Sequence, residues 1–318
     1  MAITNVLAVD IFVGRGSRSE FVANGVVLLL SSAFMFALLY YFPAWLKPLD
    51  GEEAFGWRML LALPGISIYL LLSGEWRLVT GLLGQIRRRP WLWLGLPLSA
   101  FLVGIQLWLF VWAPVNGRGL PVSLGYFMMP LVMVILGRFV YGEQMSRWQV
   151  VAVIAALVGV ANQVWQTGAV SWETFAVAIG YPLYFLLRRW QGNDHLGGIW
   201  LDMFLVLPMA AWFAFSQPAL DAFGVNTNLW WLVICFGLVS SLAVVFYLLS
   251  AKLLTFTLFG LLSYLEPVLL MFVSLLLGES IAEEEWLTYI AIWVAVGFLV
   301  IEGVQKVVRA RRYSETGL

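Results

Sequence analysis

Long apolar stretches alternate with short polar connections along nearly the whole chain. An α-helix needs about 20 apolar residues to cross the hydrocarbon core of a bilayer. Ten stretches meet this length to within a few residues, so the pattern predicts ten membrane-spanning helices, at about 21–44, 54–73, 91–113, 121–141, 148–166, 172–189, 198–216, 229–250, 256–278 and 286–305.

The composition agrees with a chain whose solvent is lipid. Of the 318 residues, 62% are hydrophobic and 11% are charged, whereas a soluble domain carries roughly 25% charged residues. The polar connections, such as Asp50-Gly51-Glu52-Glu53 and Gly192-Asn193-Asp194-His195, are short. None can hold a soluble domain, so we expect no chemistry in a separate aqueous domain and read the protein as a non-enzyme.

Several partners are excluded by the residue counts. The formal net charge is zero, which leaves no basic footprint for nucleic acid. One cysteine, Cys235, and one histidine, His195, cannot form a disulfide or a Cys/His metal site. We therefore expect no cofactor and no metal. The expected partners are the lipid bilayer and a small-molecule solute, and the sequence carries no signal for an oligomeric state.

The basic residues predict the orientation, because cytoplasmic loops are enriched in Lys and Arg. With the N-terminus inside, only Lys47, Arg58 and Arg118 of the eighteen fall toward the outside. We therefore expect a multi-pass protein of the inner (cytoplasmic) membrane with both termini cytoplasmic, an uncleaved extension at 1–20 and a basic tail at 306–318. This bias is also sufficient to explain Arg188 at the inner end of the sixth stretch.

Two pairs of stretches resemble each other across the halves. Arg58 to Pro64 and Asp202 to Pro208 have a polar residue, Met and Pro at the same spacing, 144 residues apart. Tyr126, Pro130 and Gly142-Glu143 have counterparts in Tyr264, Pro267 and Gly278-Glu279. We predict an all-α polytopic membrane protein of ten transmembrane helices arranged as two inverted five-helix repeats, 21–166 and 167–305, as in many transporters.

Three segments resemble one transporter family. Ser123 to Val132 with Gly142-Glu143 is similar to the SLGYF-x-x-PL segment and closing GE of the RarD group, and Gln106 to Ala113 resembles the segment that precedes it. Leu265-Glu266-Pro267 resembles the second-half LEP pattern of EamA-type repeats. The chain thus resembles the RarD-like group of EamA-type members of the drug/metabolite transporter (DMT) superfamily. The resemblance implies ten helices, both termini inside, and movement of metabolites or amino acids, often outward.

Charges inside membrane helices are costly and point to function. Arg58 is the candidate anchor for an anionic group, since a guanidinium binds a carboxylate through two parallel hydrogen bonds. The alternatives are snorkelling to the headgroups and a structural pair with an acid. Glu266 could pair with Arg58, bind an amine of the substrate or take up a proton, or it could form a packing hydrogen bond.

The remaining candidates have supporting roles. Asp202 is the repeat counterpart of Arg58, and inversion of the second half places the two at opposite gates, so we expect no direct contact between them. Pro130 and Pro267 are candidate gating or coupling positions, because prolines free carbonyls inside the membrane. Further candidates to line the cavity are Gln106, Trp112, Tyr126 and Tyr264.

The pattern favours a secondary or facilitative transporter that works by alternating access. Its solute would be a small polar metabolite or an amino-acid-like compound, the protein would be an exporter or exchanger, and a proton is the candidate coupling ion. Two alternatives stay open. An integral membrane enzyme acting on a lipid-linked substrate would cluster its polar residues at one interface, and a passive channel would form rings of like residues.

Overall fold

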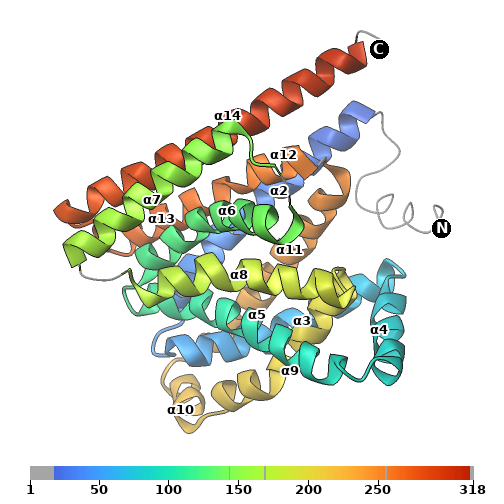
Figure 1. Cartoon of the computed structure of the whole chain (residues 1–318). Helices are drawn as coiled ribbons and strands as arrows, with labels where there is room; N and C mark the ends of the chain where they lie inside the picture. The colour runs from blue at the N-terminus through green and yellow to red at the C-terminus, as the bar shows by residue number, and fades with distance from the viewer. Residues whose placement is uncertain (1–17, 143, 168–169, 255, 316–318) are drawn as a thin grey trace.

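The computed structural model describes residues 18–142, 144–167, 170–254 and 256–315, and these residues are almost entirely helical (Figure 1). Among them there is no β-strand. Within these described ranges, eight segments are long and apolar enough to cross a membrane by length and composition. The predicted all-helical membrane protein is therefore confirmed, with eight candidate spans where the pattern predicted ten.

The helices that contain these eight segments match the predicted stretches closely. The main difference is at the C-terminal end, where the last helix continues through most of the predicted basic tail. The predicted N-terminal extension lies mainly outside the described residues, which begin at residue 18. The helices are α2 (Arg18–Tyr41), α3 (Gly51–Leu72), α5 (Leu92–Val115), α6 (Gly119–Tyr141), α7 (Arg147–Thr167), α9 (Leu196–Ala214), α11 (Leu229–Leu253) and α14 (Trp286–Glu315).

The sixth and ninth predicted spans are not among these eight segments, and each has a local reason in its sequence. The sixth forms α8 (Trp172–Gln191), whose apolar sequence is shortened by Glu173 in the first turn and by Arg188 and Arg189 in the last turn. The ninth was predicted as one helix, and this is corrected: it is split into α12 (Phe256–Ser263) and α13 (Leu265–Leu276). Pro267 contributes to the break, because proline lacks an amide hydrogen and its ring clashes with the carbonyl four residues earlier, that of Ser263.

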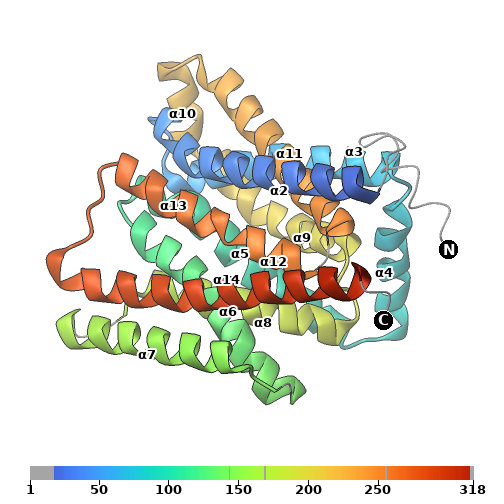
Figure 2. The same ribbon diagram turned by 90° about the horizontal axis from the view of Figure 1, so that it is seen from above.

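Two short helices and two 3₁₀ turns were not predicted. They are α4 (Trp76–Arg88), α10 (Gln217–Val225), η1 (Phe42–Trp45) and η2 (Glu283–Glu285). Helix α4 lies across the end of the bundle at which α2 begins and α14 ends (Figure 2). It has an apolar face and a basic C-terminal end, which are features of a helix that lies at a membrane surface.

The long helices pack in a pattern that relates the two halves. Helix α2 packs on α11, and α5 packs on α8. Helix α6 contacts α8 and α13, and α3 contacts both α9 and α11. Helices α7 and α14 lie side by side as a peripheral pair (Figures 1 and 2). The core is therefore made by helices from both halves of the chain.

The small residues of α7 and α14 allow their close approach. A Cβ added at Gly159 would lie 3.0 Å from the carbonyl oxygen of Thr288 and 3.2 Å from the Cβ of Ala291. Ala295 is buried in the same cluster of side chains. These contacts place the small residues at the interface between the two helices, as is common for membrane helices.

Helices α3 and α9 approach even more closely at Gly56. A Cβ there would overlap the carbonyl oxygen of Ala210 and lie 2.7 Å from the amide nitrogen of Ala214. Gly56→Ala is therefore expected to lower the free energy of unfolding by about 1–3 kcal/mol, the usual cost of overpacking, as measured by thermal or SDS unfolding. Gly81→Ala in α4, where a Cβ would meet no atom within 4 Å, is the matched control, and equal losses in both variants would contradict this packing.

Candidate functional site

Helix α3 places Arg58 inside the bundle, where its side chain is 2% exposed. The Nε atom donates a hydrogen bond to the hydroxyl of Ser240 on α11 at 3.0 Å. The guanidinium carbon lies 4.8 Å from the centre of the Phe110 ring. Within the described part of the chain, the Nη1 atom has no hydrogen-bond partner. The guanidinium is therefore held in place while part of its donor capacity remains free.

Glu266 lies in the first turn of α13 and within electrostatic reach of Arg58. It is partly exposed, unlike the fully buried Arg58. Across the described ranges, the ion pairs involve other residues, and none joins Arg58 to Glu266. Arg58 and Glu266 thus lie within electrostatic reach of each other without forming an ion pair.

Aromatic side chains surround these two charges. Phe110 packs edge-on against Phe36 at 6.1 Å and against Tyr126 at 6.4 Å between ring centres. Phe36 also packs against Tyr247 at 6.2 Å, and Tyr126 lies 5.7 Å from Tyr181. All three tyrosines interact electrostatically with Glu266. We call this set of five rings, contributed by α2, α5, α6, α8 and α11, the aromatic wall.

Three predicted site residues lie together, and three have other neighbours. Arg58, Tyr126 and Glu266 belong to the central group described above. Gln106 is buried and donates from Nε2 to the carbonyl of Ala176 at 2.8 Å, which joins α5 to α8.

The other two lie in different aromatic and apolar groups. Trp112 packs with Trp108 and Trp172 at 5.1 and 6.0 Å. Tyr264 packs against the cluster formed by α6, α7 and α14. Of the two prolines, Pro130 lies within the continuous helix α6, and Pro267 follows Glu266 directly.

Asp202 belongs to a second polar group. Its carboxylate, fully buried on α9, accepts hydrogen bonds from Ser99 at 2.6 Å, from Tyr184 at 3.0 Å and from Arg188 at 2.8 Å. Its ion pair is with Arg188 and not with Arg58, in agreement with the expected separation of Arg58 and Asp202.

Arg188 is more than a charge at the membrane surface. Its side chain is 1% exposed. From Nη2 it donates to the carbonyls of Asn193 at 2.5 Å and His195 at 2.8 Å, and Gly198 leaves room for the guanidinium. Burial, aided by the nearby Arg188 charge, lowers the pKa of His195. The charge bias of the sequence therefore did not reveal the main role of Arg188.

A third polar group joins the start of α6 to α8 and α13. Arg118 and Glu173 form an ion pair with two hydrogen bonds, at 2.5 and 2.9 Å. The hydrogen bonding to Glu173 raises the pKa of Arg118. Glu279, just after α13, accepts the amide hydrogens of Gly119 at 2.7 Å and Leu120 at 2.8 Å. Burial raises the pKa of Glu279, although these two donors act in the opposite direction.

Comparison with known proteins places the chain among transporters. A model of the EamA-like transporter family matches residues 23–162. The chain is 36% identical over 290 residues to an uncharacterized transporter of Pasteurella multocida, which covers 91% of this chain and 99% of that protein. It is 39% identical over 275 residues to the chloramphenicol-sensitive protein RarD of Pseudomonas aeruginosa, which covers 86% and 92%. No solved structure matches the chain significantly.

A helical multi-pass membrane protein with such relatives is a transporter rather than an enzyme. The chain belongs to the EamA-type drug/metabolite transporter superfamily, in its RarD-like group.

Proposed function

We propose that this protein moves a small polar, amino-acid-like solute across the inner membrane by alternating access, as an exporter or exchanger, and binds it between Arg58 and Glu266. The observation that carries the proposal is the buried guanidinium with a free Nη1 atom beside an acid that has no ion pair with it in the described residues. Neither charge is expected to stay uncompensated inside a membrane protein without a functional reason.

The chemistry of the group fits a zwitterion. The free side of Arg58 would bind the carboxylate of the solute through charge-assisted hydrogen bonds. Glu266 would face its ammonium group, and the aromatic wall would contact the rest of the molecule. When no solute is bound, Glu266 could take up a proton, which makes a proton the candidate coupling ion.

The contacts of the two halves support an inverted repeat of 21–166 and 167–305. Arg58 on α3 bonds to Ser240 on α11, and its counterpart Asp202 on α9 bonds to Ser99 on α5. In the two halves, α2 corresponds to α8, α3 to α9 and α5 to α11. The contact between α3 and α11 therefore corresponds to that between α9 and α5, and the contact between α2 and α11 corresponds to that between α8 and α5. All four contacts occur in the fold.

The other two polar groups are candidate gates at opposite ends. Leu201, next to Asp202, packs near Leu82 of α4, which lies at the end where α2 begins. Gly119, held by Glu279, accepts a hydrogen bond from Tyr40, which lies near the other end of α2. With both termini cytoplasmic, Asp202 would lie at the inner gate and Glu279 at the outer gate.

The orientation is tested by reporter fusions placed after Arg89 and after Arg118. Arg89 would be cytoplasmic and Arg118 would be outside, so a pair of reporters active on opposite sides should give opposite signals. Equal signals from the two positions would contradict the proposed topology.

Loss of the Glu279 contacts is expected to open the outer gate. In a Cys235→Ser background, Ser123→Cys places a thiol at a buried position of α6. This position lies about one helical turn after Leu120, whose amide donates a hydrogen bond to Glu279. Glu279→Ala should raise its labelling by a water-soluble maleimide about tenfold, since roughly 1.4 kcal/mol of lost gate stabilisation changes the open fraction by that factor. Glu279→Gln, which keeps one acceptor, should have a smaller effect, and unchanged labelling in both variants would contradict the gate.

The solute class is tested by thermal stabilisation of the purified protein. We expect zwitterionic amino acids to raise the melting temperature, because a ligand that binds only the folded state stabilises it. Analogues without the carboxylate or without the amine should have little effect. Equal stabilisation by an analogue without the carboxylate would contradict the role of Arg58.

A further inference from the structure

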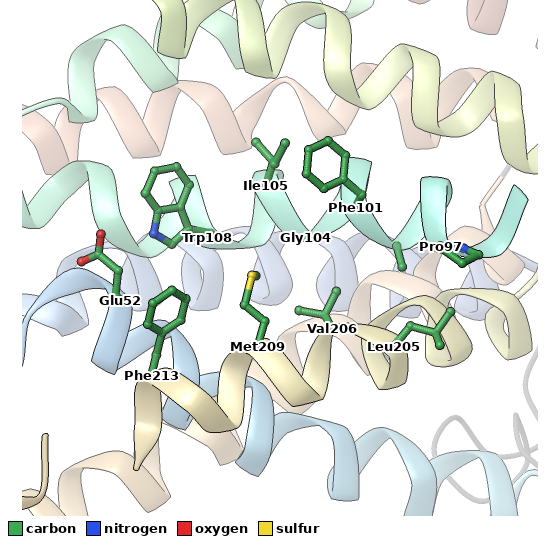
Figure 3. Close-up of a pocket in the computed structure, with 11 residues that line it drawn as sticks. Glu52, Pro97, Phe101, Gly104, Ile105, Trp108, Leu205, Val206, Met209 and Phe213 are labelled. Carbon is green, nitrogen blue, oxygen red and sulfur yellow. The ribbon is translucent and has the colours of Figure 1, made fainter. Parts of the chain in front are cut away.

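A groove runs along the outer faces of α5 and α9 (Figure 3). Its volume is about 510 Å³. Its floor consists of small or buried residues: Ala100, Gly104 and Val206. Gly104 is needed there, because a Cβ at this position would lie 3.1 Å from Val206. Its walls are the larger side chains Phe101, Ile105, Trp108, Leu205, Met209 and Phe213.

The groove faces the bilayer and has the length of one leaflet. Phe101, Leu205 and Met209 are all exposed on the faces of candidate membrane spans. The rise of an α-helix gives about 12 Å along α9 from Leu205 to Phe213, a residue that lies next to the end of that helix. One leaflet contributes about half of the 30 Å hydrocarbon core. An acyl chain that enters from that end of α9 would therefore fill the groove.

One end of the groove carries a single charged group. Glu52, in the first turn of α3, lines the groove beside Trp108 and Phe213 (Figure 3). In the part of the chain that the structure describes, its carboxylate takes part in none of the ion pairs. The neighbouring Asp50 and Glu53 are different, because they accept each other's backbone amide hydrogens in a capping box. A carboxylate flanked by aromatic rings favours an ammonium group.

We propose that this groove is a binding site for one phosphatidylethanolamine molecule of the leaflet in which Glu52 lies. The acyl chain lies between α5 and α9, and the ammonium group of the headgroup contacts Glu52 and Trp108. Phosphatidylglycerol has the same chains without an ammonium group and carries a net negative charge, so the acidic end of the groove selects against it. This site is separate from the Arg58 and Glu266 group and does not depend on the nature of the transported solute.

Native mass spectrometry of the delipidated full-length protein tests the proposal. Equal amounts of palmitoyl-oleoyl phosphatidylethanolamine and phosphatidylglycerol are added, and the single-lipid adducts are compared. Wild type should prefer phosphatidylethanolamine about fivefold, the upper range for an exposed ion pair. Glu52→Gln should lower this ratio to about one. Glu283→Gln, which removes an exposed acid outside the groove, is the matched control and should keep the wild-type ratio.

A second variant separates the chain contact from the headgroup contact. Met209→Trp places a larger ring in the groove and should reduce adducts of both lipids while leaving the ratio between them unchanged. A wild-type ratio near one, or an undiminished preference in Glu52→Gln, would overturn the proposal. Saturable binding of decyltrimethylammonium without any phosphatidylethanolamine adduct would also overturn it, because the groove would then be a site for amphiphilic cations.

Discussion

Replacement of Arg58 by alanine is expected to lower the affinity for the solute by roughly 10- to 150-fold, which corresponds to about 1.5–3 kcal/mol for hydrogen bonds to a charged group. The variant removes the only charge proposed to contact the carboxylate of the solute. It also leaves the ring of Phe110 without its cation contact. The measurement is ligand-induced thermal stabilisation over a concentration series, followed by uptake in proteoliposomes.

Two further substitutions separate charge from geometry. Arg58→Lys keeps the charge but not the planar fork that binds a carboxylate through two bonds, so we expect an intermediate loss. Ser240→Ala removes the hydrogen bond to Nε and should weaken binding less than Arg58→Ala. An affinity unchanged by Arg58→Ala would refute the site, whereas equal losses in all three variants would indicate a general folding defect.

The second large effect is expected at the buried ion pair of Asp202 and Arg188. Asp202→Ala should lower the free energy of unfolding by about 3–5 kcal/mol, because it leaves a buried guanidinium without its counter-charge. The side chains are 0% and 1% exposed, and the Arg188 nitrogen lies 2.8 Å from the carboxylate. Glu75→Gln, at the more exposed pair with Lys252, is the control, with an expected change of about 0–1 kcal/mol.

A double variant distinguishes the lost pair from lost packing. In Asp202→Asn with Arg188→Met, no charge remains to be compensated, and apolar replacement of a buried pair is often neutral. We expect the double variant to recover at least half of the stability lost in Asp202→Asn, as measured by SDS unfolding. A double variant less stable than both single variants would show that the pair itself is a major source of stability.

Much of the fold could be predicted because lipid imposes a simple rule on the sequence. Any segment that spans the bilayer must satisfy its own backbone hydrogen bonds and present apolar side chains, so the long helices are visible in the hydropathy pattern. Helix α4 was missed because it is amphipathic and, at 13 residues, too short to appear as a membrane span. The break at Tyr264 could not be predicted from Pro267, because proline alone does not determine where a helix breaks. Pro130, at the corresponding position of the first half, lies in a continuous helix.

The site could be predicted only in part. Arg58 and Glu266 stand out because a charge within an apolar stretch is rare and costly. The role of Arg188 was hidden, because an arginine at the end of a helix has a sufficient explanation in the positive-inside rule. Pairs such as Arg118 with Glu173 join residues 55 positions apart, and no periodicity in the sequence connects them. The aromatic wall likewise draws its rings from five helices.

Counterflow in proteoliposomes tests whether the protein moves a zwitterionic amino acid that binds at Arg58. Vesicles loaded with an unlabelled zwitterionic amino acid that stabilises the protein are diluted into a trace of the labelled compound. Wild type should accumulate the label transiently, whereas Arg58→Ala and vesicles without internal solute should not. Equal accumulation in wild type and Arg58→Ala would contradict the proposed site. Chemical conversion of the label without its movement would contradict transport itself.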